Sequence, residues 1–446
     1  MKPVGLYLSL ASLLALTLGF WFQNQTHQPL GNALTGDLAG RLLAYGRLAG
    51  LLAAFGLLLQ LVLVGRVRWV ERAFGLDRLT RLHHIVGFSL ALFLLSHPLL
   101  VTAGHALQGG VSWSEQLLDF FRNWEDVLAA AIGLAILLAA VGFSIAIIRS
   151  RLPYEAWYAT HLTIYIALAL AFGHQLAVGY DFLANRAFAF YWYALYAFTF
   201  GNLLYYRVLR PLLMVRRHRF FVEELRAESE DVTSVIIRGR NLESFPVEAG
   251  QFMLVRFWAP GLRWQVHPFS LSCPPDGSRL RLTIKALGDF TRRIPSIKPG
   301  TPVLIDGPHG LFTPRRCQSR KALLIAGGIG ITPLRSIADT LLADGRDVVL
   351  VYGNRTAASI VFKDELDALA AGSAGRFRVV HVLSDQADFP GEKGRVDRDR
   401  IGRLIPDIRE RDVYLCGPPP MMKKLRAGLF SLGVPESRLY DERFAL

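Results

Sequence analysis

The chain has 446 residues, 52% of them hydrophobic and 19% charged, with a formal net charge of +14. This length allows two or three domains, and no basic stripe interleaved with aromatic residues indicates a nucleic-acid partner. The three cysteines, Cys273, Cys317 and Cys416, form no CxxC pair, which argues against a zinc site, an iron–sulfur cluster or a disulfide framework.

Six apolar runs in the first half are long enough to span a bilayer. They cover residues 4–22, 41–64, 83–103, 127–148, 157–178 and 188–209. The first run resembles a signal peptide, but bulky FWFQNQ follows it without a small-x-small cleavage site, so we expect a retained helix. We therefore predict a six-helix transmembrane bundle over residues 1–212.

The loops predict the orientation of these spans. Loops 65–82 and 149–156 and the segment after the sixth run are rich in arginine, whereas loops 23–40 and 104–126 are poor in Lys and Arg. The positive-inside rule then places both termini and the polar second half in the cytoplasm. We expect a multi-pass protein of the cell (inner) membrane, in contact with lipid.

Four histidines lie in two apolar runs: His83 and His97 in the third, His161 and His174 in the fifth. Separations of fourteen and thirteen residues correspond to ~21 Å and ~20 Å along a helix. Ionisable groups in a membrane are costly, so these pairs favour a function over hydrogen bonding between helices. Two stacked haems, each held by one imidazole from each helix, would use all four side chains.

Two details of these pairs stay open. His84 is an alternative to His83, on a face about 100° away. Thirteen residues leave His161 and His174 about 140° apart on a straight helix, for which a distortion at Gly173 or the crossing of the helices has to compensate. Arg47, near the outer end of the second run, either snorkels to the interface or pairs with a buried carboxylate such as a haem propionate.

The polar half changes its pattern twice. Residues 213–318 contain short strands such as GQFMLVRF and RLRLTIKAL between Gly and Pro turns, which predicts an antiparallel β-barrel. Residues 319–446 alternate strands with helices, beginning with a strand at 321–326 and a helix that ends near residue 343, which predicts an α/β domain with a parallel sheet.

Motifs stand at the ends of these strands. The barrel region holds HPFS (267–270), KALGDFT (285–291) and DGPHG (306–310), and the α/β region holds GGIGITP (327–333) and CGPPPMM (416–422). Glycines after the first parallel strand let the backbone approach a pyrophosphate, and a helix start favours phosphate. Ligands of such sheets lie beyond the carboxyl ends of the strands, where both glycine motifs are expected.

This set of motifs, in this order, resembles the ferric reductase and NADPH oxidase superfamily over nearly the whole chain. Members join a six-helix, two-haem membrane domain to a ferredoxin-reductase-like FAD and nicotinamide module. The resemblance implies that His83 and His161 bind an inner haem b, and that His97 and His174 bind an outer one.

The resemblance also implies how the soluble motifs bind. Ser270 would lie near the reactive nitrogen of the flavin, His267 toward the phosphates, and Cys416 beside the reactive carbon of NADPH or NADH. The implied FAD-binding residues are His267, Pro268, Phe269, Ser270, Lys285, Gly288, Asp289, Phe290 and Thr291. The implied nicotinamide-binding residues are Gly327, Gly328, Gly330, Thr332, Pro333, Gly417 and Pro418.

Two further residues each have two possible roles. Arg355, after the second parallel strand, either meets an adenosine 2′-phosphate or is a solvated loop arginine. Phe444, in the ERFAL ending, resembles the aromatic residue that covers the flavin, but it could also be a core residue of a last strand.

The chain departs from the family at three points. Ala445 and Leu446 follow Phe444, so the aromatic residue is not terminal. Val101 stands where animal oxidases have another histidine, one turn beyond the outer ligand. No calcium-loop motif or regulatory domain is evident, so we expect constitutive activity without an obligate protein partner.

The predicted function is electron transfer from cytosolic NAD(P)H through FAD and two haems to an extracytoplasmic small-molecule acceptor. Oxygen, giving superoxide, is the leading acceptor and a ferric chelate the alternative, with Cys416, Phe444 and Arg47 as catalytic residues. The competing class is a transporter or structural membrane protein with a dinucleotide sensor, which would show no haem absorbance.

Overall fold

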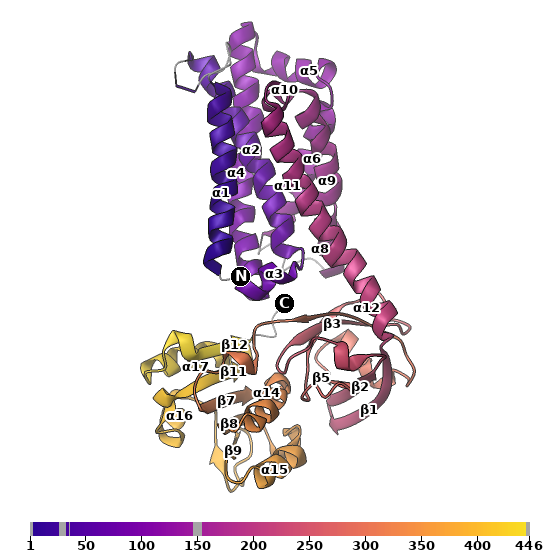
Figure 1. The fold of residues 1–446 in the computed structure, drawn as a ribbon, viewed down its shortest axis with the longest axis vertical. Helices are drawn as coiled ribbons and strands as arrows, with labels where there is room; N and C mark the ends of the chain where they lie inside the picture. Colours follow the sequence, from indigo (N-terminus) through magenta and orange to yellow (C-terminus); the bar gives the residue numbers. More distant parts are fainter. Residues whose placement is uncertain (1–2, 26–32, 35, 146–153, 443–446) are drawn as a thin grey trace. The chain divides into compact units, whose positions relative to one another are not determined.

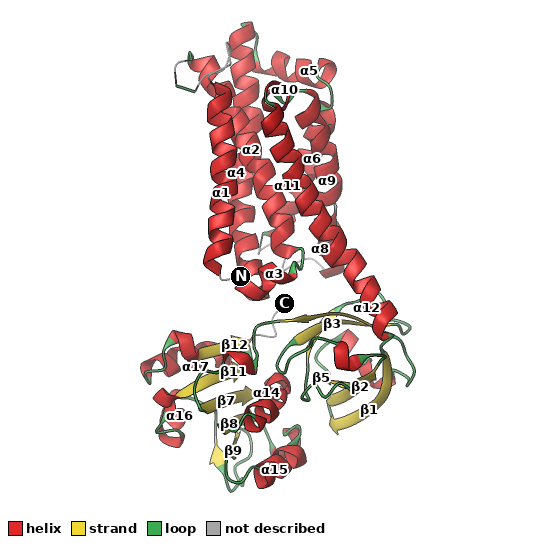
Figure 2. Ribbon diagram, viewed as in Figure 1, coloured by secondary structure: helices red, strands yellow, loops and turns green. Residues whose placement is uncertain are grey.

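The computed structural model describes residues 3–25, 33–34, 36–145 and 154–442. These residues form two compact units, Met1–Val208 and Leu209–Leu446. The first unit is helical throughout, whereas strands occur in the second (Figure 2). The expected domain limits of 1–212, 213–318 and 319–446 stay a prediction.

The first unit is a bundle whose long helices run alongside one another (Figure 1). Its helices are α1 (Pro3–Gln25), α2 (Leu38–Val64), α3 (Arg68–Phe74), α4 (Leu76–Gly109), α5 (Trp113–Asn123), α6 (Val127–Ser144), α8 (Tyr154–Leu162), α9 (Ile164–Ala177), α10 (Tyr180–Ala184) and α11 (Arg186–Leu203). Apolar side chains of α2, α4, α6 and α9, among them Leu57, Leu90 and Leu137, form one of its cores.

Five stretches of the described residues are long and apolar enough to cross a membrane. They are Val4–Gln25, Leu38–Val64, Arg78–Gly109, Val127–Ser144 and Ala156–Ala177, and they match the first five predicted runs. The sixth predicted run corresponds to α11 and the π-helical turn Leu204–Leu209, which are not among them. A six-span bundle therefore stays a prediction.

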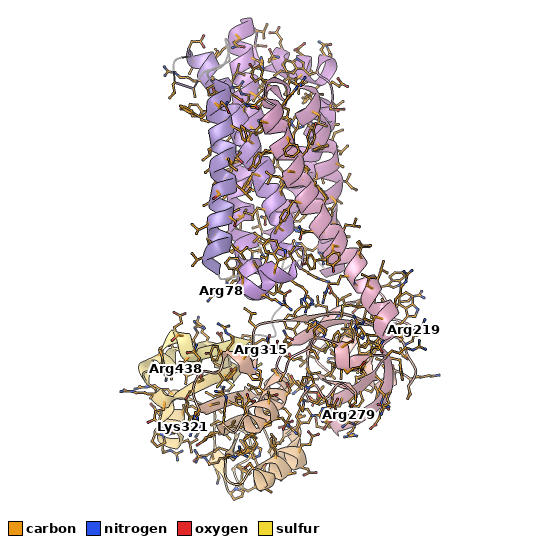
Figure 3. All side chains as sticks on the ribbon, in the orientation of Figure 1. Arg78, Arg219, Arg279, Arg315, Lys321 and Arg438 are labelled. Atoms are coloured by element: carbon orange, nitrogen blue, oxygen red, sulfur yellow. The ribbon has the colours of Figure 1, made fainter. Side chains whose placement is uncertain are left out.

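The second unit begins with α12 (Arg210–His218) and two antiparallel sheets. Their elements are β1 (Phe221–Ser229), β2 (Val232–Arg238), β3 (Phe252–Phe257), β4 (His267–Ser270), β5 (Leu280–Lys285), α13 (Asp289–Arg292) and β6 (Val303–His309). The strand orders are β1-β2-β5 and β4-β3-β6. Side chains such as Val235, Met253 and Leu282 fill one core between them, while Arg219 and Arg279 lie at the surface (Figure 3).

The seams between these two sheets are short. Single bridges, Phe221 with Pro302 and Leu271 with Leu282, connect their edges. Backbone hydrogen bonds from the Val222 amide to the Thr301 carbonyl and from the Val303 amide to the Phe220 carbonyl, both 2.9 Å, extend the first seam. A hydrogen bond from the Ser272 amide to the Arg281 carbonyl, also 2.9 Å, extends the second. The two sheets meet at short seams, and a continuous antiparallel barrel is not confirmed.

The rest of the second unit is an α/β fold with a six-stranded parallel sheet, as predicted. Its elements are β7 (Lys321–Gly327), α14 (Ile331–Ala343), β8 (Asp347–Asn354), α15 (Lys363–Gly372), β9 (Phe377–Leu383), β10 (Glu392–Lys393), α16 (Arg398–Leu404), β11 (Arg411–Cys416), α17 (Pro419–Ser431) and β12 (Leu439–Glu442). The strand order is β10-β9-β8-β7-β11-β12. Side chains of α14 and α15 pack on one face of the sheet, and those of α16 and α17 on the other.

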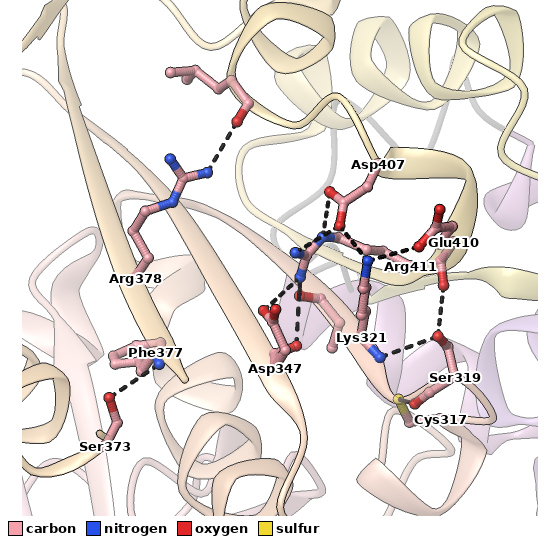
Figure 4. Close-up of polar contacts among 12 residues, drawn as sticks. Cys317, Ser319, Lys321, Asp347, Ser373, Phe377, Arg378, Asp407, Glu410 and Arg411 are labelled. Atoms are coloured by element: carbon pink, nitrogen blue, oxygen red, sulfur yellow. Dashed lines mark hydrogen bonds and ion pairs between the residues drawn. The ribbon is translucent and has the colours of Figure 1, made fainter. Parts of the chain in front are cut away.

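Charged side chains join the amino ends of the central strands (Figure 4). Lys321 Nζ lies 3.0 Å from Asp407 Oδ2 and 2.7 Å from Glu410 Oε2. Arg411 lies 2.9 Å from both Asp407 and Asp347. These ion pairs fasten one edge of the sheet and leave the carboxyl edge, where the glycine motifs lie, for ligands.

Candidate functional site

The four predicted histidines form two pairs inside the first unit. The ring centroids of His83 and His161 lie 6.0 Å apart, and those of His97 and His174 lie 6.2 Å apart. Two imidazoles on opposite faces of one metal ion, each with a bond of about 2 Å, place their ring centres about 6 Å apart. The spacing of both pairs thus fits a metal ion with one histidine on each side.

The ring nitrogens are also suitably arranged. His97 Nδ1 is 2.8 Å from the carbonyl of Gly46, and His161 Nδ1 is 3.4 Å from Ser144 Oγ. Among the described residues, the buried Nδ1 atoms of His83 and His174 have no hydrogen-bond partner. A hydrogen bond at Nδ1 orients the ring and leaves Nε2 for a metal. His97 and His161 have such a partner at Nδ1, and four imidazoles in two pairs fit haem as a donor set. The ligand assignment itself stays a prediction.

A one-residue interruption of the regular helix lies between His161 and His174. Helix α8 ends at Leu162 and α9 begins at Ile164, with Thr163 between them. The Thr163 hydroxyl donates to the carbonyl of Thr160 at 2.6 Å. This interruption lies between the two histidines, and the backbone of Thr163 itself stays helical, with φ of −63° and ψ of −14°.

Gly173 is not the point of distortion. Helix α9 runs through Gly173 without interruption. A methyl group at this position would collide with the carboxylate of Asp126. The glycine thus permits a close contact with the start of α6, and its expected role as a distortion site is wrong.

His84 and Val101 take other positions. His84 is exposed, and its ring centroid lies 6.1 Å from that of His83. Val101 packs on α2, because a methyl group at Gly46 would lie 2.8 Å from its side chain.

Arg47 has partners that the sequence did not predict. Its Nε lies 3.9 Å from Asp181 Oδ2, and its guanidinium lies 5.4 Å from the ring centroid of Tyr180. The side chain of Asp181 is only 5% exposed and accepts a hydrogen bond from Asn24 Nδ2 at 2.8 Å. The signal that could have revealed Asp181 is an acid isolated between two apolar runs.

The HPFS motif forms β4, beside the GDFT motif. The rings of His267 and Phe290 are 3.9 Å apart, and Phe269 stacks with Phe290 at 6.3 Å. The hydroxyl of Ser270 is buried and has no hydrogen-bond partner among the described residues. A buried hydroxyl without a partner is costly, so this position suits a ligand with a polar atom, such as a flavin.

The GDFT turn is organised by Thr291. Its hydroxyl accepts hydrogen bonds from the amides of Leu287 and Gly288 at 2.8 Å and 2.9 Å. Asp289 is almost fully exposed, and Lys285 lies 3.2 Å from Asp231. The first amides of α13 thereby stay available for a phosphate, whereas Lys285 already has a carboxylate partner.

The two glycine motifs of the α/β fold touch each other at the carboxyl ends of β7 and β11. Gly328 has a φ of +51°, and a side chain there would meet open space. A methyl group at Gly330 would collide with the carbonyl of Cys416. Strand β8 continues the sheet on one side of β7 and β11 on the other, so the motifs lie where the strand order reverses.

The other nicotinamide-site candidates lie near this point. Thr332 donates to the carbonyl of Ile329 at 3.0 Å, and Pro333 is buried in the first turn of α14. Gly417 and Pro418 directly precede α17 and adjoin Gly327. These residues form the starts of α14 and α17, which both lie at the carboxyl ends of strands of the parallel sheet.

Cys416 is the last residue of β11 and is fully buried. Burial raises the pKa of its thiol well above the ordinary value, so it is neutral near pH 7. Glu442 of β12 is its neighbour in register. Phe444 lies outside the described residues, and Arg355 is exposed directly after β8.

Comparisons with known families agree with this layout. Residues 49–172 match the ferric reductase like transmembrane component, residues 217–312 an FAD-binding domain, and residues 324–427 an oxidoreductase NAD-binding domain. Fold and sites thus define a membrane-type helical domain followed by FAD-binding and NAD-binding domains. The chain thus has the architecture of a ferric-reductase-like transmembrane component joined to FAD-binding and NAD-binding domains.

Individual relatives match part of the chain. An NADPH oxidoreductase of Mycobacterium tuberculosis is 32% identical over 251 residues, 54% of this chain and 64% of that protein. NADH-cytochrome b5 reductase 1 of Debaryomyces hansenii is 36% identical over 174 residues, 36% of this chain and 61% of that protein. The chain thus spans less than two thirds of the length of either relative.

A solved structure shows a likeness of similar extent. The FAD/NAD-binding domain of a nitric oxide dioxygenase from Vibrio cholerae is 24% identical, with a TM-score of 0.45, and the likeness covers 51% of this chain and 99% of that one.

Proposed function

We propose that the chain transfers electrons from cytosolic NAD(P)H, by way of FAD and two b-type haems, to an acceptor on the other side of the membrane. The observation that carries the proposal is the pairing of His83 with His161 and of His97 with His174, at 6.0 Å and 6.2 Å. The matches to FAD-binding and NAD-binding domains supply the other end of the route. When bound, FAD and haem supply the redox chemistry, FAD accepting a hydride and releasing single electrons.

The side chains of the protein bind and orient these groups. The Gly46 carbonyl fixes the His97 ring, and Ser270 offers an unused hydroxyl beside the flavin-binding motif. The contact between Gly330 and the Cys416 carbonyl holds the two nicotinamide-site turns together. Arginine-rich loops orient the second unit, and with it NAD(P)H oxidation, toward the cytoplasm.

The haem assignment is tested on the purified chain. We expect two low-spin haems per chain by spectroscopy and haem extraction, because imidazole pairs fill both axial positions. His97→Ala or His174→Ala should each remove one haem and spare much of the other. His84→Ala is the matched control and should retain both. Two haems with unaltered spectra in His97→Ala would overturn the assignment.

For the acceptor we propose oxygen, giving superoxide. If His97 and His174 both held the outer haem, they would leave no free position on its iron, so the acceptor would not bind the iron itself. Arg47 would attract oxygen-derived anions with the part of its charge that Asp181, 3.9 Å away, does not compensate. The outer loops show no dense carboxylate cluster to collect ferric ions. The alternative, a ferric chelate, is favoured by the family description of residues 49–172 and by Val101 in place of a further histidine.

The acceptor experiment compares two reactions of the same preparation. We expect NADPH-driven cytochrome c reduction that superoxide dismutase abolishes, and that Arg47→Ala lowers while the exposed control Arg41→Ala does not. Fast reduction of ferric citrate without oxygen, together with negligible superoxide, would assign the chain as a ferric reductase instead. NADPH or NADH preference is read from the same assay, where contact of Arg355 with a 2′-phosphate would favour NADPH.

A further inference from the structure

Three helical elements follow one another between residues 186 and 218. Helix α11 ends at Leu203, the π-helical turn Leu204–Leu209 follows, and α12 begins at Arg210. Pro211 stands at the start of α12, where its ring would clash with the carbonyl four residues earlier in a regular helix. The wider π turn relieves that clash, so the helix continues instead of ending.

We call the two antiparallel sheets, β1-β2-β5 and β4-β3-β6, the flavin-binding sheets. A buried ion pair connects Arg210, the first residue of α12, to β6 of these sheets. Arg210 Nη1 lies 3.1 Å from Asp306 Oδ1, and the two side chains are 9% and 11% exposed. The other guanidinium nitrogen, Nη2, donates to the carbonyl of Gly307. Asp306 and Gly307 are the first two residues of the DGPHG motif. The guanidinium therefore binds both a side chain and the backbone of this turn.

The same motif lies next to β12, the edge strand of the six-stranded parallel sheet. His309 Nε2 is 3.7 Å from Asp306 Oδ1, and Gln251 Nε2 donates to the Gly310 carbonyl at 3.2 Å. A methyl group at Gly310 would lie 3.2 Å from the carboxylate of Glu442, the last described residue of β12. The DGPHG turn therefore lies between the helix that leaves the membrane domain and the chain segment beyond the Cys416 strand.

Removing one partner of a buried ion pair leaves an uncompensated buried charge, which is strongly destabilising. The contact between α12 and β6 therefore depends on both Arg210 and Asp306. A displacement of about 1 Å at a reacting group can cost about a hundredfold in rate. Loosening the contact would alter the position of the flavin-binding sheets on α12 without touching HPFS, GDFT or the glycine motifs.

We infer that Arg210 and Asp306 are positioning residues that clamp the flavin-binding sheets to the helix leaving the membrane domain. The clamp governs electron delivery from FAD into the membrane domain and leaves reduction of FAD by NAD(P)H unaffected. The inference deepens the proposed function and rests on it for the electron-transfer consequence alone.

The test separates the two electron-transfer steps in the full chain, purified in nanodiscs with FAD. Stopped-flow spectroscopy follows flavin reduction and haem reduction after mixing with NADPH in the absence of oxygen. We expect Arg210→Gln to slow haem reduction at least about tenfold and to leave flavin reduction within about twofold, with Arg210→Lys in between. Arg216→Gln, an exposed change on the same helix, is the control and should alter neither step.

Hydrogen exchange provides a readout that does not depend on haem or on turnover. Arg210→Gln and Asp306→Asn should both accelerate amide exchange in residues 210–218 and 303–310, and Arg216→Gln should not. Unchanged exchange in both variants, or flavin and haem reduction falling together with loss of FAD, would overturn the clamp. A wild-type chain without haem would instead overturn the proposed function, and the exchange experiment would then decide the clamp by itself.

Discussion

At the scale of single residues, the chemistry of the site depends on buried groups whose charge state is set by their surroundings. The Ser270 hydroxyl is buried without a partner among the described residues, which is the state expected of a group that binds a ligand. The Nδ1 atoms of His83 and His174 are likewise buried without a partner among these residues. Arg47 differs, because Asp181 already compensates its charge. The charge that Arg47 can offer to an anion is thereby reduced.

The cysteines give a prediction at this scale. Burial raises the pKa of all three thiols, that of Cys317 to about 12, so each is protonated at pH 7.5. Because the thiolate is the reactive form, we expect iodoacetamide to label Cys416 at least about tenfold more slowly than an exposed thiol introduced by Ser278→Cys. Mass spectrometry of the labelled chain measures the rates. Equal rates in the folded protein would contradict the burial of Cys416.

At the scale of elements, close helix packing positions the outer histidine pair. Helix α2 approaches α4 at Gly50, where an added methyl group would lie 2.7 Å from His97 Nδ1. Such a contact has to displace either the imidazole or the helix, and overpacking of this kind costs about 1–3 kcal/mol. The ring position therefore depends on a glycine in a neighbouring helix, which the spacing of the histidines alone does not reveal.

We therefore expect Gly50→Ala to lower the melting temperature and to reduce the haem content toward one per chain. The matched control is Gly142→Ala in α6, where an added methyl group meets nothing within 4 Å. That change should keep both haems and leave the melting temperature unchanged or slightly higher, since alanine favours helix. Full haem content in Gly50→Ala would show that the His97 ring can move without loss of binding.

The ion pairs at the amino ends of the parallel strands give a pH-dependent prediction. Hydrogen bonds from Arg411 and Lys321 lower the pKa of Asp407 from 3.8 to about 2. A lowered pKa in the folded state means that the carboxylate stabilises the fold above pH 4 and loses this effect as the pH falls toward 2.

Asp407→Asn should consequently speed amide exchange in β7 and β11 at pH 7, and the difference from wild type should shrink at pH 3. Hydrogen exchange with mass spectrometry, with labelling times scaled to the intrinsic rate at each pH, measures this difference. Asp399→Asn, at a side chain that is 91% exposed, is the control. A difference that grows toward pH 3 would show that Asp407 does not act as a charged partner.

At the scale of the whole molecule, each compact unit contains its own apolar cores. The second unit has one core between the flavin-binding sheets and one on each face of the parallel sheet. Hydrogen bonds such as that from the Gly250 amide to Ser336 Oγ, 2.8 Å, connect its two halves. A unit with separate cores and internal connections can fold without the rest of the chain.

A fragment of residues 209–446 should therefore fold and, with added FAD, oxidise NAD(P)H with ferricyanide as acceptor. It retains both Arg210 and Asp306, so the clamp forms in it. Circular dichroism and the ferricyanide assay measure the two properties, and heat-denatured fragment is the control. A folded fragment that binds FAD but shows no activity would contradict the modular arrangement.

Features that depend on local composition and residue order could be predicted from the amino-acid sequence. Five apolar spans, the parallel sheet and the glycine turns follow from hydropathy, strand–helix alternation and residues that only certain backbone conformations accept. The histidine spacing indicated paired cofactor ligands before any geometry was known. A single apolar span, strand–helix–strand unit, glycine turn or histidine pair occupies about thirty consecutive residues or fewer. Over so short a stretch, chain connectivity limits the conformations that the residues can adopt.

Only the tertiary structure decided which distant residues meet. The break at Thr163, the pairing of Arg47 with Asp181 and the clamp between Arg210 and Asp306 leave no periodic trace in the sequence. The last two join residues more than ninety positions apart, and the first lies where α8 and α9 pack against α6. Burial makes such contacts selective, because an isolated charge or polar group away from water is costly, and burial is a property of the folded chain.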